Sequence, residues 1–286
     1  MPSVRDLRDR IRSLKNTQQI TKAMKQVAAA KIRRADAVCK QSRPYADALG
    51  EMLRDLIASV GVIDHPFMRP GHAGAPKGVI VMTADKGLAG AFNGNLVRAA
   101  FLLQRDDHNV VWYAVGNKGR NGVRRFPQQT IANWALSQGS KLDTARAVAA
   151  KVSEDFVAGR ISEIVLIAPR LISTMVQRPE TRSIIPLVPE KQEKPADGPR
   201  AVVEFAPSPE AVLTRLLPKY LEFTLFSAML ETDAAFFSAQ LIAMNNATEN
   251  AGKMIDELTI VMNKARQAAI TKEMLEIVGG AEALAG

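Results

Sequence analysis

The sequence predicts an α/β domain inserted between two long α-helices that pair as an antiparallel coiled coil. Both ends carry apolar residues at helical spacing and few helix breakers, whereas the middle alternates β-rich apolar runs with helical stretches. The ends also carry opposite charge. Residues 1–43 hold twelve Lys/Arg against three Asp, a net +9, and residues 221–286 hold four against nine acidic residues, a net −5. The two ends are therefore suited to lie against each other.

These patterns divide the chain into four parts. We expect an N-terminal coiled-coil helix over residues 1–60, a linker over 61–76, a Rossmann-like α/β foot domain over 77–206, and a C-terminal coiled-coil helix over 207–286. A helix much longer than the usual ~11–12 residues needs a partner along its length. The predicted pairing supplies that partner for both helices.

The first helix is predicted over residues 3–58, with Ser3 as its N-cap and a kink at Pro44. The apolar stripe starts with 3-4 heptad spacing and is then expected to slip, as at a coiled-coil stutter. Its members before the slip are Val4, Leu7, Ile11 and Leu14. Its members after the slip are Ile20, Met24, Val27, Ala28, Ile32 and Ala35.

The second helix is predicted over residues 209–284 and would be roughly 110 Å long. Ser208 is placed to cap it, Pro209 is tolerated in its first turn, and Pro218 should bend it. Small and apolar residues keep strict 3-4 spacing near its end, which allows close approach of a partner helix. These residues are Ala251, Ile255, Leu258, Met262, Ala265 and Ala269.

The central part indicates a small, largely parallel sheet. Strands are expected over residues 77–83, 109–115 and 161–168, and helices near 91–105 and 141–158. Residues 181–188 and 201–205 resemble the two strands of a hairpin.

A glycine-rich turn, DKGLAGAFNGN over residues 85–95, follows the first of these strands. Such turns can hold phosphate on backbone N–H groups, but the spacing here fits neither G-x-G-x-x-G nor the P-loop. Three interpretations stay open: a nucleotide-binding enzyme, a tight turn that needs small residues for packing, and a protein contact. A nucleotide-binding enzyme would bind ATP as an isolated chain.

The sequence gives little support for a metal site, a catalytic site, a nucleic-acid site or a membrane span. Cys39 is the single cysteine, the three histidines are scattered, and no G-x-S-x-G is present, so we expect no metal, cofactor or active site. The basic run at residues 31–34 could contact phosphates. However, no aromatic residues interleave with it, and the acidic second helix argues against a nucleic-acid protein. No apolar run is long enough to cross a membrane, and the charged start is not a secretory signal.

Three blocks carry a family resemblance: IRSLKNTQQITKAMKQVAAAK at residues 11–31, DKGLAGAFNGN, and the block from NNATENAGKM to EIVGGAEAL at 245–284. Together they closely resemble the gamma subunit of bacterial F-type ATP synthases. The resemblance implies a non-catalytic central-stalk rotor that couples ion-driven rotation of the membrane c-ring to ATP synthesis. It implies an alpha3/beta3 ring, an epsilon subunit and the c-ring as partners, at the cytoplasmic face of the plasma membrane, with no cofactor and no nucleic acid.

The resemblance also implies contact residues. Those expected to face beta subunits are Met24, Lys25, Asp85, Lys86, Gly87, Leu88, Arg266 and Gln267. Those expected to turn in an apolar sleeve at the tip of the shaft are Ile277, Val278, Ala281 and Leu284. One segment departs from the family: where S-E-x-x-A-R-M is usual, residues 235–241 read AFFSAQL. We predict that Phe236 or Phe237 packs against the α/β domain or the first helix.

Overall fold

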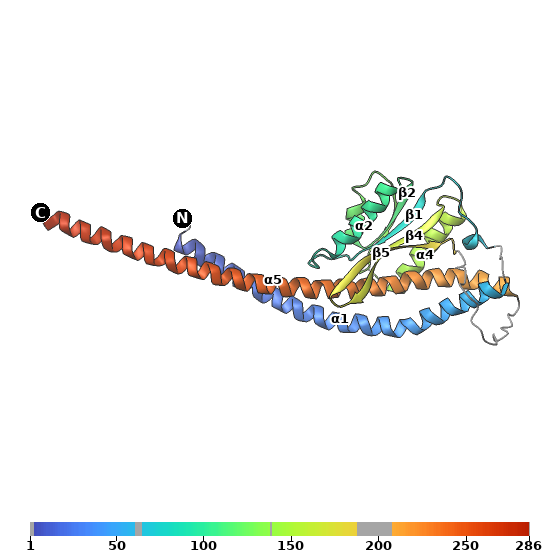
Figure 1. The fold of residues 1–286 in the computed structure, drawn as a ribbon, viewed down its shortest axis with the longest axis horizontal. Coiled ribbons are helices and arrows are strands. Elements are labelled where there is room, and N and C mark those ends of the chain that lie inside the picture. Colours follow the sequence, from blue (N-terminus) through green and yellow to red (C-terminus); the bar gives the residue numbers. More distant parts are fainter. Residues whose placement is uncertain (1–2, 61–64, 138, 188–207, 286) are drawn as a thin grey trace. The chain divides into compact units, whose positions relative to one another are not determined.

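A computed structural model describes residues 3–60, 65–137, 139–187 and 208–285 of the chain. Its two long helices are α1 (Val4–Val60) and α5 (Pro209–Ala285), of 57 and 77 residues (Figure 1). The chain forms two compact units. The first, which we call the shaft unit, combines residues 1–29 with 240–286, and the second, the foot unit, contains residues 30–239.

Both long helices begin as the sequence predicts. The Ser3 hydroxyl accepts a hydrogen bond from the Asp6 amide (3.1 Å), and the Asp6 carboxylate accepts one from the Ser3 amide (3.2 Å). This reciprocal capping box holds the first turn of α1, and the bond from Ser3 lowers the pKa of Asp6. The Ser208 hydroxyl accepts from the Ala211 amide (3.3 Å), which caps α5. Both helices continue past their internal prolines, Pro44 and Pro218.

The shaft unit is an antiparallel helix pair, as predicted. Three polar contacts fix its register: Lys25 Nζ donates to Asn245 Oδ1 (2.6 Å), Thr248 Oγ1 donates to Thr21 Oγ1 (2.8 Å), and Gln18 Nε2 donates to the Thr248 carbonyl (3.4 Å). As the residue number on α1 falls from 25 to 21, the number of its partner on α5 rises from 245 to 248. The two helices therefore run in opposite directions.

The predicted α1 stripe after the slip is wrong at Ile20 and Val27, whereas its other members, Met24, Ala28, Ile32 and Ala35, are buried or half-buried. Ile20 and Val27 are 60% and 54% exposed, whereas Thr21 and Ala28 are buried. The seam that begins at Leu7 continues through the polar residues Gln18 and Thr21 before it reaches Met24 and Ala28. Thr21 satisfies its hydroxyl within the seam, by donating to the Gln18 carbonyl (3.1 Å) and accepting from Thr248. A hydrogen-bonded threonine can therefore occupy a seam position that apolar patterning assigns to its neighbours.

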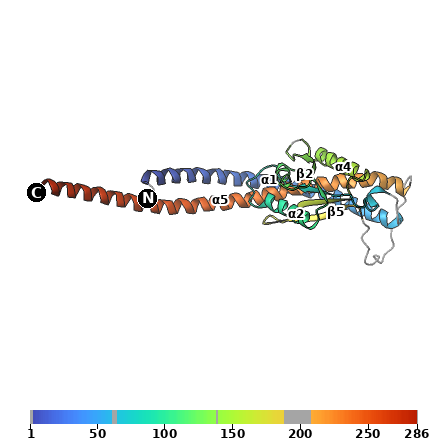
Figure 2. The ribbon, with the colours of Figure 1, turned by 90° about the horizontal axis from the view of Figure 1, so that it is seen from above.

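The α5 stripe is confirmed up to Ala265 and wrong at Ala269. Ala251 is buried, the stripe residues from Ile255 to Ala265 are half-buried, and Ala269 is exposed. The register explains the difference. Position 25 lies opposite 245 and position 21 opposite 248, so Val4, where α1 begins, falls near Ala265. Beyond this point α5 has no α1 residue opposite it, and Figures 1 and 2 show its end running past the start of α1.

The foot unit contains a five-stranded sheet in the order β3-β2-β1-β4-β5. The strands are β1 (Lys77–Met82), β2 (Val110–Val115), β3 (Thr130–Trp134), β4 (Glu163–Ser173) and β5 (Val176–Ile185). The first four are parallel, as predicted, and β5 pairs antiparallel with β4. The strand expected at 181–188 thus begins earlier, and its hairpin partner is β4. The other expected partner, residues 201–205, lies outside the described residues.

Helices cover both faces of this sheet, and strand residues alternate between them. Val79 and Val81 face α2 (Phe92–Asp106) and α3 (Asn117–Val123), whereas Ile80 and Met82 face α4 (Lys141–Val157) and the first part of α5. All four β1 residues are fully buried. Burial on both faces explains why the strands read as continuous apolar runs.

Part of the predicted linker packs into the core. A 3₁₀ turn, η1 (Pro66–Met68), is capped by His65, whose Nδ1 accepts from the Phe67 amide (3.1 Å). Phe67 is buried, and its ring lies 6.2 Å from that of Phe156 on α4. Residues 61–64 lie outside the described residues.

The packing predicted for the diverged segment is confirmed. The Phe236 ring is buried with its centroid 5.9 Å from that of Phe92, at the start of α2. Phe237 lies beside it and receives Lys31 Nζ at 5.2 Å from its ring centroid. The pair thus joins α5 to the α/β domain and to α1 within the foot unit.

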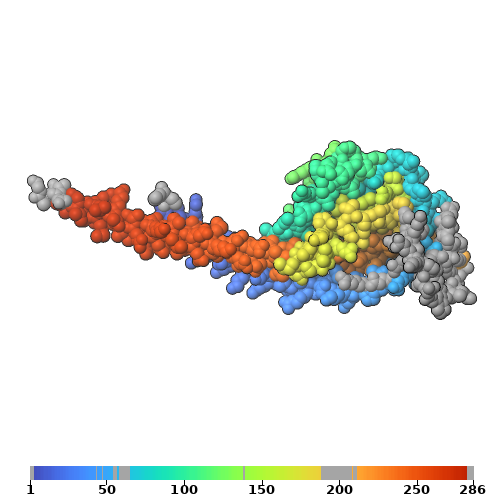
Figure 3. Space-filling view, viewed as in Figure 1, coloured from blue at the N-terminus to red at the C-terminus, as the bar shows by residue number. Residues whose placement is uncertain are grey.

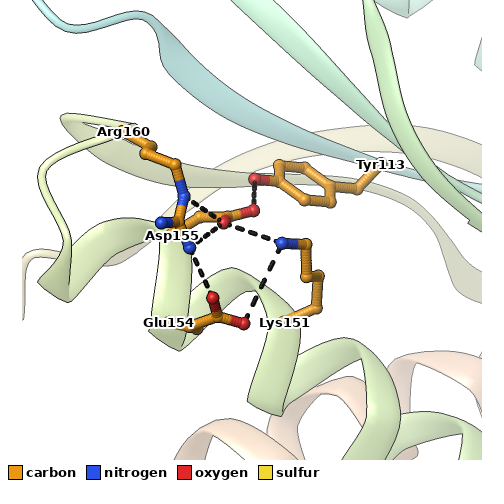
Figure 4. A network of polar contacts seen from close by, with 5 residues as sticks. All are labelled: Tyr113, Lys151, Glu154, Asp155 and Arg160. Carbon is orange, nitrogen blue, oxygen red and sulfur yellow. Dashed lines mark hydrogen bonds and ion pairs between the residues drawn. The ribbon is translucent and has the colours of Figure 1, made fainter.

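A buried carboxylate, Asp155 on α4, organises a polar network under the sheet (Figure 4). Its side chain is 1% exposed and accepts hydrogen bonds from Tyr113 (2.5 Å), Lys151 (3.0 Å) and Arg160 (2.7 Å). Burial opposes its ionisation, but the hydrogen bonds led by that from Tyr113 hold the Asp155 pKa below its usual value. Burial and the adjacent carboxylate raise the pKa of the Tyr113 phenol.

Candidate partner interface

The glycine-rich turn leaves the carboxyl end of β1 and is held from inside by its own polar groups. The Asn93 side chain accepts a hydrogen bond from the Ala84 amide (3.0 Å) and donates one to the Lys86 carbonyl (3.1 Å). Leu88 and Gly90 adopt positive φ angles of 62° and 57°. Asn93 therefore fills the inside of the turn, which supports the tight-turn interpretation of its glycines over the phosphate-cradling one.

Asp85 points inward. Its carboxylate accepts hydrogen bonds from the amides of Asn117 (2.8 Å), the first residue of α3, and Ser137 (2.6 Å), in the loop after β3. Burial works against the charged form, but these bonds prevail and lower the pKa of Asp85. Asp85 thus ties the turn after β1 to the start of α3 and to the loop after β3. The outer surface of the turn is left to its neighbours, Lys86 and Leu88, of which Leu88 is 62% exposed.

Thr83 and Gly116 support the same end of the sheet, and neither was singled out from the sequence. The Thr83 hydroxyl accepts a hydrogen bond from the Gly119 amide (2.6 Å). Gly116 has φ 92°, and a Cβ there would lie 2.0 Å from the Thr83 carbonyl oxygen. Only glycine permits this approach of β2 to β1. The sign of this close approach in the sequence is a glycine directly after an apolar strand. That sign does not reveal which residue lies opposite the glycine.

In the shaft unit, Lys25 is exposed and Met24 is half-buried. Lys25 is held by Asn245, whose amide in turn donates to Glu249 (2.7 Å). Arg266 and Gln267 are both exposed, just beyond the last α5 residue that α1 covers. The helix after them is exposed throughout its described side chains, including Ile277, Val278 and Ala281 (Figure 3). Leu284 lies within α5, but its side chain is outside the described part of the chain.

The predicted contact residues are divided between the two units. The turn residues 85–88 belong to the foot unit, and the others belong to the shaft unit. Within the described residues, no three His, Cys, Asp or Glu side chains are grouped as a metal site would need. None of the described helices has the length and apolarity to cross a membrane.

An α/β domain inserted between two long, antiparallel helices defines a class of protein: a helical stalk with a globular foot. The comparisons identify the family. The family described as ATP synthase matches residues 3–284. Proteins named ATP synthase gamma chain from Heliobacterium modesticaldum and Desulforamulus reducens are 41% and 43% identical, each over 99% of this chain and 100% of the relative. The chain belongs to the ATP synthase gamma chain family, the non-catalytic central-stalk subunit of F1.

Solved structures agree in fold. A chain of the Euglena gracilis mitochondrial ATP synthase, in an assembly of OSCP, F1 and c-ring, aligns with a TM-score of 0.66 at 18% identity, over 98% of this chain and 94% of that one. A chain of the Tetrahymena thermophila mitochondrial central stalk and c-ring aligns with a TM-score of 0.61 at 22% identity, over 80% and 99%. These likenesses support the fold of long helices around a mixed sheet.

Proposed function

We propose that this chain is the rotor shaft that couples ion-driven rotation of a membrane c-ring to ATP synthesis in an alpha3/beta3 ring. The observation that carries the proposal is the bare end of α5. Past Ala265 the helix loses its α1 partner, yet it keeps large apolar side chains, and those that the structure describes there are all exposed. These are Ile270, Met274, Leu275, Ile277 and Val278.

An isolated helix of this kind is not stable in water by itself, and such apolar exposure indicates an enclosing partner. Apolar side chains make no strong directional bonds, so an enclosed tip that carries them can turn without favouring one angle. The four predicted tip residues Ile277, Val278, Ala281 and Leu284 would turn in a sleeve of the alpha3/beta3 ring. This tip would be the upper bearing of the shaft.

The contact residues predicted from the sequence fit the proposal to different degrees. Lys86, Gly87 and Leu88 would meet a beta subunit, with Asp85 holding their turn in place rather than touching the partner. Lys25 and Met24 would lie near a beta-subunit lever loop, and Arg266 and Gln267 would lie where the ring grips the shaft. We further propose that the epsilon subunit and the c-ring bind the foot domain, 77–206, at the cytoplasmic face of the plasma membrane. The predicted coiled-coil helices, 1–60 and 207–286, would together form the rotor shaft. The predicted linker, 61–76, would join the first of them to the foot domain.

The test is reconstitution with alpha and beta subunits from the same source. We expect a 3:3:1 complex whose ATPase activity is well above that of alpha plus beta alone and is lost when residues 270–286 are removed. The double variant Ile277→Asp/Val278→Asp should lose most of the same activity. The matched control, Glu273→Ala/Glu276→Ala, changes neighbouring polar residues and should keep it.

Two results would contradict the proposal. One is the absence of any complex with alpha and beta. The other is ATP turnover by this chain alone, which would return the glycine-rich turn to consideration as a nucleotide site.

A further inference from the structure

The bare end of α5, residues 266–285, carries an apolar stripe that does not continue the seam with α1. Past Ala269 the 3-4 spacing of that seam would fall on Lys272 and Glu276, which instead form an exposed ion pair with each other (3.6 Å). The apolar stripe of the bare end begins one residue later, at Ile270, which turns it by about 100° around the helix. The bare end therefore presents its apolar side to a partner other than α1.

This stripe consists of Ile270, Met274, Ile277 and Ala281. All four are exposed, Ile270 by 50% and Ile277 by 72%. The steps of 4, 3 and 4 residues between them are the same in both directions along the helix. In an antiparallel pair of two copies, Ile270 would lie opposite Ala281 and Met274 opposite Ile277. The stripe is thus self-complementary, as the interface of a two-fold dimer must be.

The charges of the bare end favour the same antiparallel arrangement. Residues 266–275 hold two Lys/Arg against one Glu, a net +1, and residues 276–285 hold two Glu, a net −2. Antiparallel pairing places the positive half of each copy beside the negative half of the other. Parallel pairing would instead place like charges together, which costs affinity.

The length of the bare end also fits a second copy. Because α1 begins at Val4, opposite Ala265, a copy that pairs over residues 266–285 would end beside the start of α1 without displacing it. Gly279 and Gly280 each make the helix about 1 kcal/mol less favourable than alanine would. A partner helix would therefore stabilise this segment in the free chain.

We propose that two unassembled copies of this chain pair through Ile270, Met274, Ile277 and Ala281 as an antiparallel, two-fold symmetric helix dimer. The dimer covers the apolar face that the free chain would otherwise leave exposed. The same face is the one proposed to turn in the alpha3/beta3 sleeve, so the dimer must separate before the chain enters that ring. This last step rests on the proposed function, whereas the dimer itself rests on the bare end of α5 alone.

Sedimentation equilibrium of the isolated full-length chain, over a range of concentrations, measures the dimer. We expect a reversible change from the mass of one chain to the mass of two. Ile277→Asp should raise the dissociation constant at least about tenfold, because two-fold symmetry buries the new charge twice. Gly279→Asp is the matched control. It adds the same charge in line with Lys272 and Glu276, where the Cβ position is open, and should leave the dissociation constant nearly unchanged.

Cysteine pairs test the orientation, in a Cys39→Ser chain that has no other thiol. Ile270→Cys/Ala281→Cys should form a covalent dimer on mild oxidation, because each cysteine faces the other type across the antiparallel pair. The two cannot bridge within one chain, since the helix between them holds them roughly 16 Å apart. Ile270→Cys alone should stay largely uncrosslinked. Lys272→Cys/Gly279→Cys, placed with the same symmetry on the polar side, should also stay uncrosslinked.

Three results would overturn the inference. They are the mass of a single chain at every concentration, a covalent dimer that forms equally fast from Ile270→Cys alone, and a complex with alpha and beta in which two copies of this chain stay paired. The first result, together with an active 3:3:1 complex, would leave the rotor function intact. A dimer that forms while no complex with alpha and beta does would keep the dimer and contradict the rotor function instead.

Discussion

Phe236 of α5 packs against Phe92 at the start of α2, with ring centroids 5.9 Å apart. Phe92 lies within the glycine-rich segment 85–95, where α2 begins, and Asn93 beside it holds the turn closed. A contact between two apolar rings therefore joins the long helix to the loop proposed to meet a beta subunit.

Replacing Phe236 with alanine should destabilise the foot unit by about 3–5 kcal/mol, because it leaves a cavity between α5 and α2. Phe237→Ala is the matched control. Phe237 is only half-buried and loses a contact with an exposed lysine, so a smaller loss of about 1–2 kcal/mol is expected. Both tryptophans of the chain, Trp112 and Trp134, belong to the foot unit, so urea unfolding followed by tryptophan fluorescence reports that unit alone. Equal effects of the two variants would contradict the packing described here.

Local chemistry predicted much of this fold. The caps at Ser3 and Ser208 and the strands β1, β2 and β4 depend on residues close together in the chain, so the sequence shows them directly. Strand β3 is short and half-buried, and α3 contains two glycines, so neither carries a strong pattern. The sequence could not show these elements by periodicity alone.

Contacts between residues far apart in the sequence were harder to predict, because local patterning does not record them. The family resemblance implies that Asp85 lies at a beta-subunit contact, which stays a prediction, but the sequence did not show that its carboxylate binds Asn117 and Ser137, 32 and 52 residues away. Thr21 was passed over in favour of Ile20 because patterning measures polarity, whereas burial depends on whether a hydroxyl finds a partner. Thr248, its partner, is 227 residues away.

The polar seam of the shaft unit should show coupling between Thr21 and Thr248. Thr21→Val or Thr248→Val alone leaves the other hydroxyl with one partner fewer in a closely packed seam. The double variant removes both and should cost less than the sum of the single variants. We expect a coupling of about 1 kcal/mol, measured by far-UV circular dichroism during urea unfolding. Strict additivity would show that the two hydroxyls do not interact.

Gly116→Ala should destabilise the foot unit by about 2–4 kcal/mol, because the new Cβ meets the Thr83 carbonyl oxygen and the φ of 92° disfavours alanine. Gly94→Ala is the control. Gly94 lies in α2 with open space around its Cβ position, so alanine should raise stability by about 0.5–1 kcal/mol through its better helix propensity. Tryptophan fluorescence again gives the readout, and a neutral Gly116→Ala would mean that β1 and β2 do not approach as closely as described.

The Asp155 network should make the foot unit sensitive to acid. The folded pKa of Asp155 is lowered, so its contribution to stability is fully present above the unfolded value of about 3.9 and is lost as the pH falls below that value through the folded pKa. Asp155→Asn removes the charge that Lys151 and Arg160 bind. It should cost about 1–3 kcal/mol at pH 7 and flatten the fall in stability between about pH 4 and 2.

Glu154→Gln is the matched control for this titration. Glu154 is an exposed residue that also binds Arg160 (2.7 Å), so its loss removes one charge of the same network without touching the buried carboxylate. Exposed ion pairs contribute little to stability. Glu154→Gln should therefore change the free energy of unfolding by less than about 1 kcal/mol, both at pH 7 and between about pH 4 and 2. Urea unfolding at a series of pH values gives the comparison. If Asp155→Asn kept the full acid sensitivity of the parent chain, the dependence would have to come from other carboxylates, of which Asp85, with its two amide donors and lowered pKa, is the next to test.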